Sequence, residues 1–228
     1  VITGQAVSEP PSVARDDFWI TDGPVYAMEQ GFGMIYLGGD FRYVGPNVGS
    51  GAALDAGSGL PDLEFPKVNG EVKAVVTDGT GGWFIGGKFT AVGGVGRTNL
   101  AHIKPDKTVN PAWTANANGR VNALALSGTV LFVGGEFTSV NGQLRSKLAA
   151  LDAATGQPTA WDAGAVGTVH AVAVSGGTLY VGGEFSSILG RTRKNIAALE
   201  AGTGQPTDWN PVAFGAVYAL AVQGNVVY

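Results

Sequence analysis

The residues best placed for chemistry are charged side chains that recur at one interval. Each of four Gly-Gly pairs is followed by a charged residue, and an arginine stands nine residues after three of these: Asp40, Lys88 with Arg97, Glu136 with Arg145, and Glu184 with Arg193. Carboxylates can act as general acids or bases. Residues that recur in every unit usually serve the unit, however, so we interpret Glu136 with Arg145, and Glu184 with Arg193, as structural pairs that each bridge a hairpin.

Other catalytic and metal chemistry finds little support in the residue types. The chain has no cysteine, and its two histidines, His102 and His170, have no second histidine or paired carboxylate at ligand spacing. No Gly-x-Ser-x-Gly turn precedes a helix pattern, and the glycine-rich runs lack the Lys-Ser/Thr of a phosphate loop. We therefore predict no enzymatic activity, no cofactor and no resident metal, and leave adventitious calcium open at the Asp152 and Asp162 loops.

A second set of positions changes its residue type from unit to unit. Segments of the form Val-x-Ala begin at Val25, Val72, Val121, Val169 and Val217, and the middle residues are Tyr26, Lys73, Asn122, His170 and Tyr218. If the first strand of each unit lines a central axis, these five side chains form a mixed ring near a channel. We call them the channel ring, and they are the candidate binding residues.

Both sets belong to an internal repeat of 48 residues. The Gly pairs begin at Gly38, Gly86, Gly134 and Gly182, and three tryptophans keep the same interval: Trp113, Trp161 and Trp209. Identical placement of the tryptophans favours core packing over a carbohydrate-stacking role. Glycine pairs inside a strand indicate a bulge or a close approach by another backbone, so we expect tightly packed sheet faces.

Each unit reads as four short β segments separated by turn residues. In the clearest unit these are residues 169–174, 178–187, 195–200 and 207–211. A tandem unit with four strands is typical of a β-propeller blade. We therefore predict an all-β protein, a β-propeller of four-stranded blades, in a single domain over residues 1–228.

The chain length corresponds to four complete repeats and a remainder. The repeats span about 25–71, 72–120, 121–168 and 169–216, with half-blades at 1–24 and 217–228. Either the halves pair to close a five-bladed ring, or the chain is a window from a larger propeller, which we favour because the next Gly pair would fall just beyond Tyr228.

Composition excludes several other classes of protein. The 228 residues include 37 Gly and 11 Pro, which disfavours a helical protein, and 45% are hydrophobic, which disfavours disorder. The net charge of -4 argues against nucleic acid as a partner. No apolar run approaches the roughly 18 residues of a membrane-spanning helix.

The repeat resembles a known class of propeller. Residues 121–126, 131–142, Arg145 and 148–152 are similar to the delta-60 repeat of bacterial secreted and surface proteins. The resemblance implies a propeller and export, and it implies no activity. Residues 150–161 and 198–209 resemble the tryptophan docking motif of quinoprotein propellers more weakly, because the Gly-to-Trp interval is one residue too long.

These observations lead to one functional prediction and one alternative. We expect a non-catalytic, secreted or cell-surface propeller that serves as a scaffold or protein interaction module, with self-assembly into a layer or filament as a further form of association. The alternative is a glycan-binding or carbohydrate-active propeller whose site lies at the channel ring.

Overall fold

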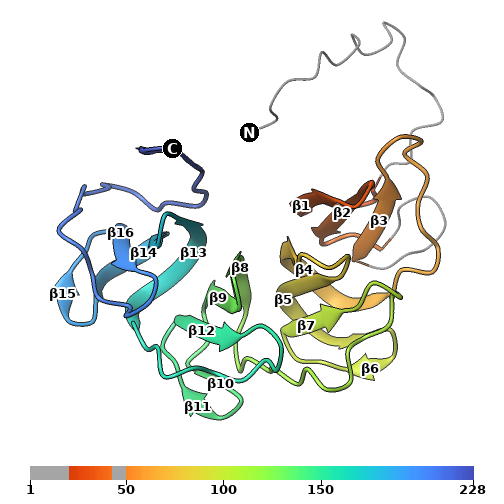
Figure 1. Cartoon of the computed structure of the whole chain (residues 1–228), viewed down its shortest axis with the longest axis horizontal. Helices are drawn as coiled ribbons and strands as arrows, with labels where there is room; N and C mark the ends of the chain where they lie inside the picture. The colour runs from red at the N-terminus through yellow and green to blue at the C-terminus, as the bar shows by residue number, and fades with distance from the viewer. Residues whose placement is uncertain (1–20, 43–49) are drawn as a thin grey trace, which may run out of the picture.

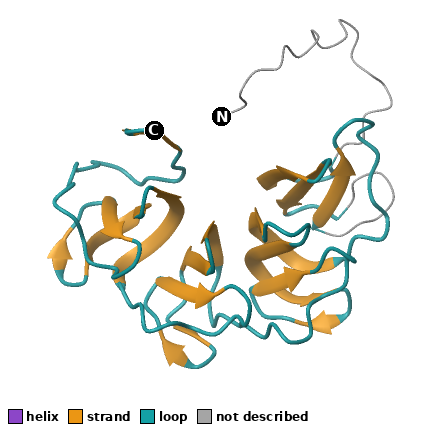
Figure 2. Ribbon diagram, in the orientation of Figure 1, coloured by secondary structure: helices purple, strands orange, loops and turns teal. Residues whose placement is uncertain are grey.

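The computed structural model of the chain describes residues 21–42 and 50–228. These residues form β-strands and turns with no helix, which confirms the all-β prediction (Figures 1 and 2). The predicted half-blade at 1–24 lies almost entirely outside the described residues. Within the two described ranges, no helix is long and apolar enough to cross a membrane.

The described strands form four successive antiparallel sheets. In chain order, the sheets contain β1 (Val25–Gly31), β2 (Met34–Gly39) and β3 (Gly51–Asp55); β4 (Val68–Thr77), β5 (Trp83–Val92), β6 (Val95–Gly96) and β7 (Leu100–Ile103); β8 (Val121–Ser127), β9 (Val130–Gly135) and β12 (Leu148–Asp152); and β13 (Ala165–Ser175), β14 (Thr178–Ile188), β15 (Arg191–Thr192) and β16 (Ile196–Glu200). Two short hairpins are separate: β10 (Ser139–Val140) with β11 (Gln143–Leu144), and β17 (Val222–Gln223) with β18 (Val226–Val227).

Two-residue turns connect the first and second strands of the first, third and fourth sheets, and a five-residue loop connects β4 and β5. Between β13 and β14 the loop is Gly176-Gly177, with φ of 55° and 79°, and the register closes with Ser175 opposite Thr178. A two-residue hairpin turn with positive φ at both positions matches the right-handed twist of the strands, and glycine adopts it without a Cβ penalty. The sequence Ser-Gly-Gly thus fixes this hairpin locally.

The four sheets lie side by side along an arc, as the blades of a β-propeller do. The first strands of the sheets, β1, β4, β8 and β13, lie on the inside of the arc, and the later strands lie further out (Figure 1). The arc formed by the described residues is open, because β1 and the C-terminal hairpin β17–β18 lie apart in Figure 1.

The glycine pairs are the points where neighbouring sheets meet. A Cβ on Gly86, Gly134 or Gly182 would lie 2.5 Å from a Cγ1 of Val121, Val169 or Val217 in the following segment, and Gly38 meets Val72 in the same way. The second glycine of each pair faces the backbone carbonyl that directly precedes the Val of the first strand, for example Gly135 against Arg120 O. The close approach predicted from the sequence is therefore confirmed.

The hydrophobic core lies between consecutive sheets. One buried cluster joins Phe84 and Leu100 of the second sheet to Val121, Leu131 and Val133 of the third. Trp113 is fully buried in it, and Trp161 is 8% exposed in the next cluster, so both pack in the core as predicted. Because the three larger clusters each join two sheets, the stability of one sheet depends on its neighbour.

The predicted fourth strand of each unit is wrong. Residues 207–211 form no strand, and the segment meets β16 only through the isolated bridge between Leu199 and Pro206, as Leu151 and Pro158 do in the third unit. In the second unit the same isolated bridge joins Ile103 and Val109, so pairing stops after one bridge with or without a proline. The outermost part of each sheet is an irregular segment instead.

Candidate functional site

Four members of the channel ring lie in β-strands, and a β-bulge places each of them at the same point of its sheet. In β4, Val72 pairs with Gly87 and Ala74 pairs with Gly86, which leaves Lys73 without a partner. The register shift repeats in the other three sheets around Tyr26, Asn122 and His170. A bulge inserts one unpaired residue and re-aims its side chain. These positions are therefore released from the ladder while their Val and Ala neighbours stay in it.

Contacts link the channel ring from one sheet to the next. Lys73 Nζ lies 3.3 Å from the centroid of the Tyr26 ring, which is a cation–π distance. Asn122 donates a hydrogen bond of 3.0 Å to Val169 O, and the rings of His170 and Tyr218 lie 4.8 Å apart. The structure thus brings Tyr26 together with Lys73 and His170 together with Tyr218, while Asn122 bonds the backbone of the next sheet.

The predicted hairpin ion pairs do not form. Arg193 donates hydrogen bonds to Thr192 O and Thr207 O, at 2.8 and 2.7 Å, while Glu184 accepts a 3.1 Å hydrogen bond from Tyr218. Arg193 is 8% exposed and its guanidinium bonds Thr207 O of the irregular outer segment, so it makes no ion pair with Glu184 on β14.

Arg145 follows the same pattern in the third unit. It donates to Leu144 O and Thr159 O, and the carboxylate of Glu136 instead lies 3.9 Å from Arg120. Arginine at this repeat position therefore holds two carbonyls of its own unit, which is why it recurs where its expected acidic partner does not.

A network of charges runs beside the channel ring across the second and third sheets. Glu71 lies 3.0 Å from Lys73 and 3.5 Å from Arg120, which in turn reaches toward Glu136. Sequence reasoning missed Glu71 and Arg120. The signal was present, because each stands directly before the Val of a Val-x-Ala segment, where the repeats carry Pro24, Glu71, Arg120 and Thr168.

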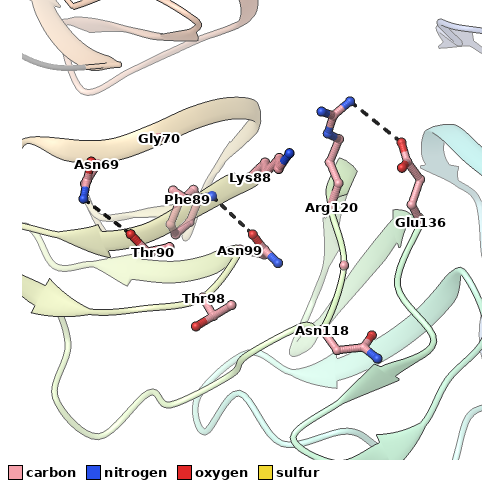
Figure 3. A pocket seen from close by; sticks show the side chains of 11 residues that line it. Asn69, Gly70, Lys88, Phe89, Thr90, Thr98, Asn99, Asn118, Arg120 and Glu136 are labelled. Atoms are coloured by element: carbon pink, nitrogen blue, oxygen red, sulfur yellow. Dashed lines mark hydrogen bonds and ion pairs between the residues drawn. The ribbon is translucent and has the colours of Figure 1, made fainter.

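These charges border a groove of about 470 Å³ between the second and third sheets (Figure 3). We call it the cationic groove, and its lining comprises Asn69, Gly70, Lys88, Phe89, Thr90, Thr98, Asn99, Asn118, Gly119, Arg120 and Glu136. In Figure 3 the Lys88 side chain extends from β5 toward the Arg120 guanidinium. The two basic side chains come from different sheets and face one space.

Two further grooves occupy equivalent places in the fold. One, of about 440 Å³, is lined by Asp40, Arg42 and Glu71 among others, and one of about 490 Å³ is lined by Glu184 and Lys194 among others. The residue after the Gly pair is acidic in both. Of these three grooves, only the one between the second and third sheets has a lysine at that position.

His102 takes part in a separate polar cluster near the rim. Its Nε2 lies 2.9 Å from Asp78 Oδ2, its Nδ1 lies 3.1 Å from Asn110 Nδ2, and its ring stacks on Phe84 at 4.4 Å. Both ring nitrogens are occupied by protein partners. Among residues 21–42 and 50–228, no group of three or more His, Asp or Glu side chains is arranged to hold a metal ion.

Comparison with known proteins supports the fold. No model of a protein family matches the sequence, and no curated protein matches it. Solved structures do match at low identity. The extracellular domain of the putative one-component system BT4673 from B. thetaiotaomicron matches with a TM-score of 0.57 and 13% identity, over 90% of this chain and 25% of that one.

Two other matches have the same character. The computationally designed protein Ika8 matches with a TM-score of 0.55 and 15% identity over 89% of this chain, and the Neurospora crassa Pan2 WD40 domain with 0.53 and 15% over 87%. The chain spans 66% of the length of Ika8 and 56% of the Pan2 chain. These likenesses show a β-propeller fold.

Proposed function

We propose that this chain is a non-catalytic β-propeller that binds partner proteins through the surface around its channel ring. The observation that carries the proposal is the bulge. At one position in each of the four sheets the side chain is free of the ladder, and there the repeats carry four different residue types, Tyr26, Lys73, Asn122 and His170. Tyr218 continues the series in a segment outside the strands. Residues that serve the fold repeat, whereas these vary, so they are available for recognition.

Exposure supports the same surface. Tyr26 is 43% exposed and Tyr218 is 67% exposed, and tyrosine is enriched where proteins bind one another because it combines a large apolar area with a polar end. The delta-60 resemblance adds the proposal that binding occurs outside the cell or at its surface. This rests on the repeat residues 121–152 rather than on the solved structures.

A site-specific photo-crosslinker tests the proposal. Benzoylphenylalanine replaces Tyr26, and in a matched control it replaces Leu144, which is 79% exposed on the separate hairpin β10–β11. Irradiation in extracts of the source cells is expected to give a discrete adduct from position 26 and none from 144. Identical adducts from both positions, or none from 26, contradict the proposal. An adduct between two copies of this chain assigns the binding to self-assembly.

The alternative is a glycan-binding surface at the same ring, favoured by the exposed rings of Tyr26 and Tyr218. A panel of neutral and acidic oligosaccharides tests it. Binding that is lost in Tyr26→Ala with Tyr218→Ala, in a protein that keeps its thermal midpoint, supports this reading. The protein-binding proposal predicts no change in glycan affinity in the variant with Tyr26→Ala and Tyr218→Ala. It predicts the same for the variant with Lys73→Ala and His170→Ala.

A further inference from the structure

Arg120 differs from the other buried or half-buried arginines because its hydrogen-bond donors are unused. Arg97 and Arg193 each donate to two backbone carbonyls, as Arg145 does. The Arg120 side chain makes no hydrogen bond within the described part of the chain; its Nε is buried without a partner, as are those of the other three arginines. Its ion pairs, at 3.5 and 3.9 Å, are longer than hydrogen bonds.

Lys88 adds a second cation to the same groove. It is exposed and has no hydrogen bond or ion pair with any described residue. The whole molecule carries a net charge of -4, so an unpaired ammonium beside a guanidinium whose only partners are the long ion pairs to Glu71 and Glu136 is a local exception in the described part of the chain. A planar guanidinium beside a flexible ammonium suits a carboxylate, which can accept two parallel N–H bonds from arginine and a third from lysine.

The other lining groups favour an extended peptide over a sugar. Phe89, the aromatic residue of the lining, is 2% exposed, so the groove presents no ring face for stacking. Asn69, Thr90 and Thr98 are exposed and carry amide or hydroxyl groups that can hydrogen-bond a peptide backbone.

We propose that the cationic groove binds an acidic side chain of a partner protein, with the carboxylate held between Lys88 and Arg120. The inference rests on the proposed function and specifies the chemistry of the partner. In the equivalent grooves, Asp40 and Glu184 stand in the place of Lys88, so neither groove has a cation at that position. The acidic residue of the cationic groove, Glu136, lies 3.9 Å from Arg120. Recognition of the carboxylate is therefore confined to one of the three grooves.

Fluorescence anisotropy with a labelled Gly-Glu-Glu-Glu-Gly peptide tests this inference, with Gly-Gln-Gln-Gln-Gly as the neutral probe. We expect the Glu peptide to bind at least about tenfold more tightly than the Gln peptide. Arg120→Gln is expected to weaken binding about tenfold and Lys88→Ala about fivefold. Lys88→Glu changes only an exposed side chain and is expected to abolish binding. Affinity falls as salt rises.

Lys194→Ala is the matched control, because it removes one positive charge from the equivalent groove of the fourth sheet. It is expected to leave the affinity unchanged. Equal affinity for the two peptides, or no effect of Lys88→Glu, overturns the inference. Tighter binding of an oligogalacturonate, with the same sensitivity to Lys88→Glu, overturns the peptide as occupant.

The crosslinking experiment separates the two proposals. If the protein does not bind the Glu peptide but the crosslinker at position 26 captures a partner, the inference about the cationic groove is wrong and the proposed function stands. If the protein binds the peptide through Lys88 and Arg120 but gives no adduct, the inference about the cationic groove stands and the channel ring is not the contact surface.

Discussion

At the scale of single residues, His102 shows what a departure from the repeat does. The equivalent positions in the third and fourth sheets are Ala150 and Ala198, both buried. In the second sheet the imidazole fills this place and bonds Asp78, whose other oxygen accepts the backbone N–H groups of Thr80 and Gly82. The irregular loop after β4 is thereby anchored to β7.

This anchor predicts a pH dependence of stability. Burial acts to raise the pKa of Asp78, but the hydrogen bonds from His102, Thr80 and Gly82 outweigh it and leave the pKa below its ordinary value. A depressed folded-state pKa gives stabilisation that is complete above the unfolded value, near pH 4, and is lost as the pH falls through the folded value. Asp78→Asn should cost about 1 kcal/mol at pH 7 and should flatten the acid limb.

Urea unfolding at pH 7 and at pH 3 measures the effect. The control is Asp208→Asn, which changes an exposed carboxylate without a hydrogen bond or ion pair to any described residue. A loss of stability on acidification that is as large in Asp78→Asn as in the unaltered protein shows that the anchor is not the source.

Sequence could locate the charged residues but could not give their direction. Glu184 and Arg193 have opposite charges and lie on one hairpin, which made an ion pair the simplest interpretation. In the structure the guanidinium turns outward to Thr207 O. The carbonyl of Thr207, in an irregular segment, needs a donor, and no pattern of residue types shows in advance where such a segment lies.

At the scale of elements, the glycine pairs determine how closely sheets can pack. Gly134→Ala places a methyl group 2.5 Å from Cγ1 of the fully buried Val169, whose branched side chain has little freedom to move. We expect a loss of about 2 kcal/mol in the free energy of unfolding, the cost of overpacking. Adding Val169→Ala should recover part of the loss, which a double-mutant cycle from urea unfolding measures.

Gly96→Ala is the matched control for this substitution. Gly96 also lies in a strand, but a Cβ there meets no atom within 4 Å and its φ is not positive. Its effect should be within about 0.5 kcal/mol of zero. Equal effects at Gly96 and Gly134, or strict additivity of Gly134→Ala and Val169→Ala, contradict the proposed contact.

The strands that were predicted correctly are those whose own residue types and flanking turns favour a strand. The segment 178–187 is rich in β-branched and aromatic residues and follows a Gly-Gly turn, and it forms β14 over Thr178–Ile188. The segment at Trp209 was predicted as a strand from its position in the repeat. In the structure an isolated bridge between Leu199 and Pro206 joins this segment to β16, and residues 207–211 form no strand.

At the scale of the whole molecule, the arc exposes one sheet face that its repeats elsewhere bury. Val25 is 42% exposed, whereas Val72, Val121 and Val169 at the same repeat position are at most 1% exposed. Met28 on the same strand is 68% exposed. The first sheet thus has a described neighbour on one side, and the second and third sheets have one on both.

Hydrogen exchange followed by mass spectrometry should reveal this asymmetry. In an array stabilised by nearest-neighbour contacts, a unit with one neighbour opens at lower free energy than a unit with two. Amides of β1 and β2 should therefore exchange faster than those of β8 and β9, by about tenfold or more. Uniform protection across the four sheets contradicts this and indicates that the Val25 face is covered in solution.

The succession of the sheets could be predicted from the spacing of the glycine pairs, because only glycine fits where two backbones approach closely. The cationic groove did not follow, since Lys88 and Arg120 belong to different repeats and meet only when the sheets are placed side by side. Neither residue looks unusual within its own repeat. Their significance lies in the comparison with the acidic grooves beside them.

The bulge opposite each glycine pair also affects how the sequence can change over time. At Lys73 and its equivalents, a substitution breaks no ladder bond and leaves the Val–Gly contact between sheets intact. Mutations there are cheap for folding, so new side chains can accumulate without compensating changes elsewhere. A library randomised at these positions should yield mostly folded variants, which makes the arc a scaffold on which new specificities can evolve.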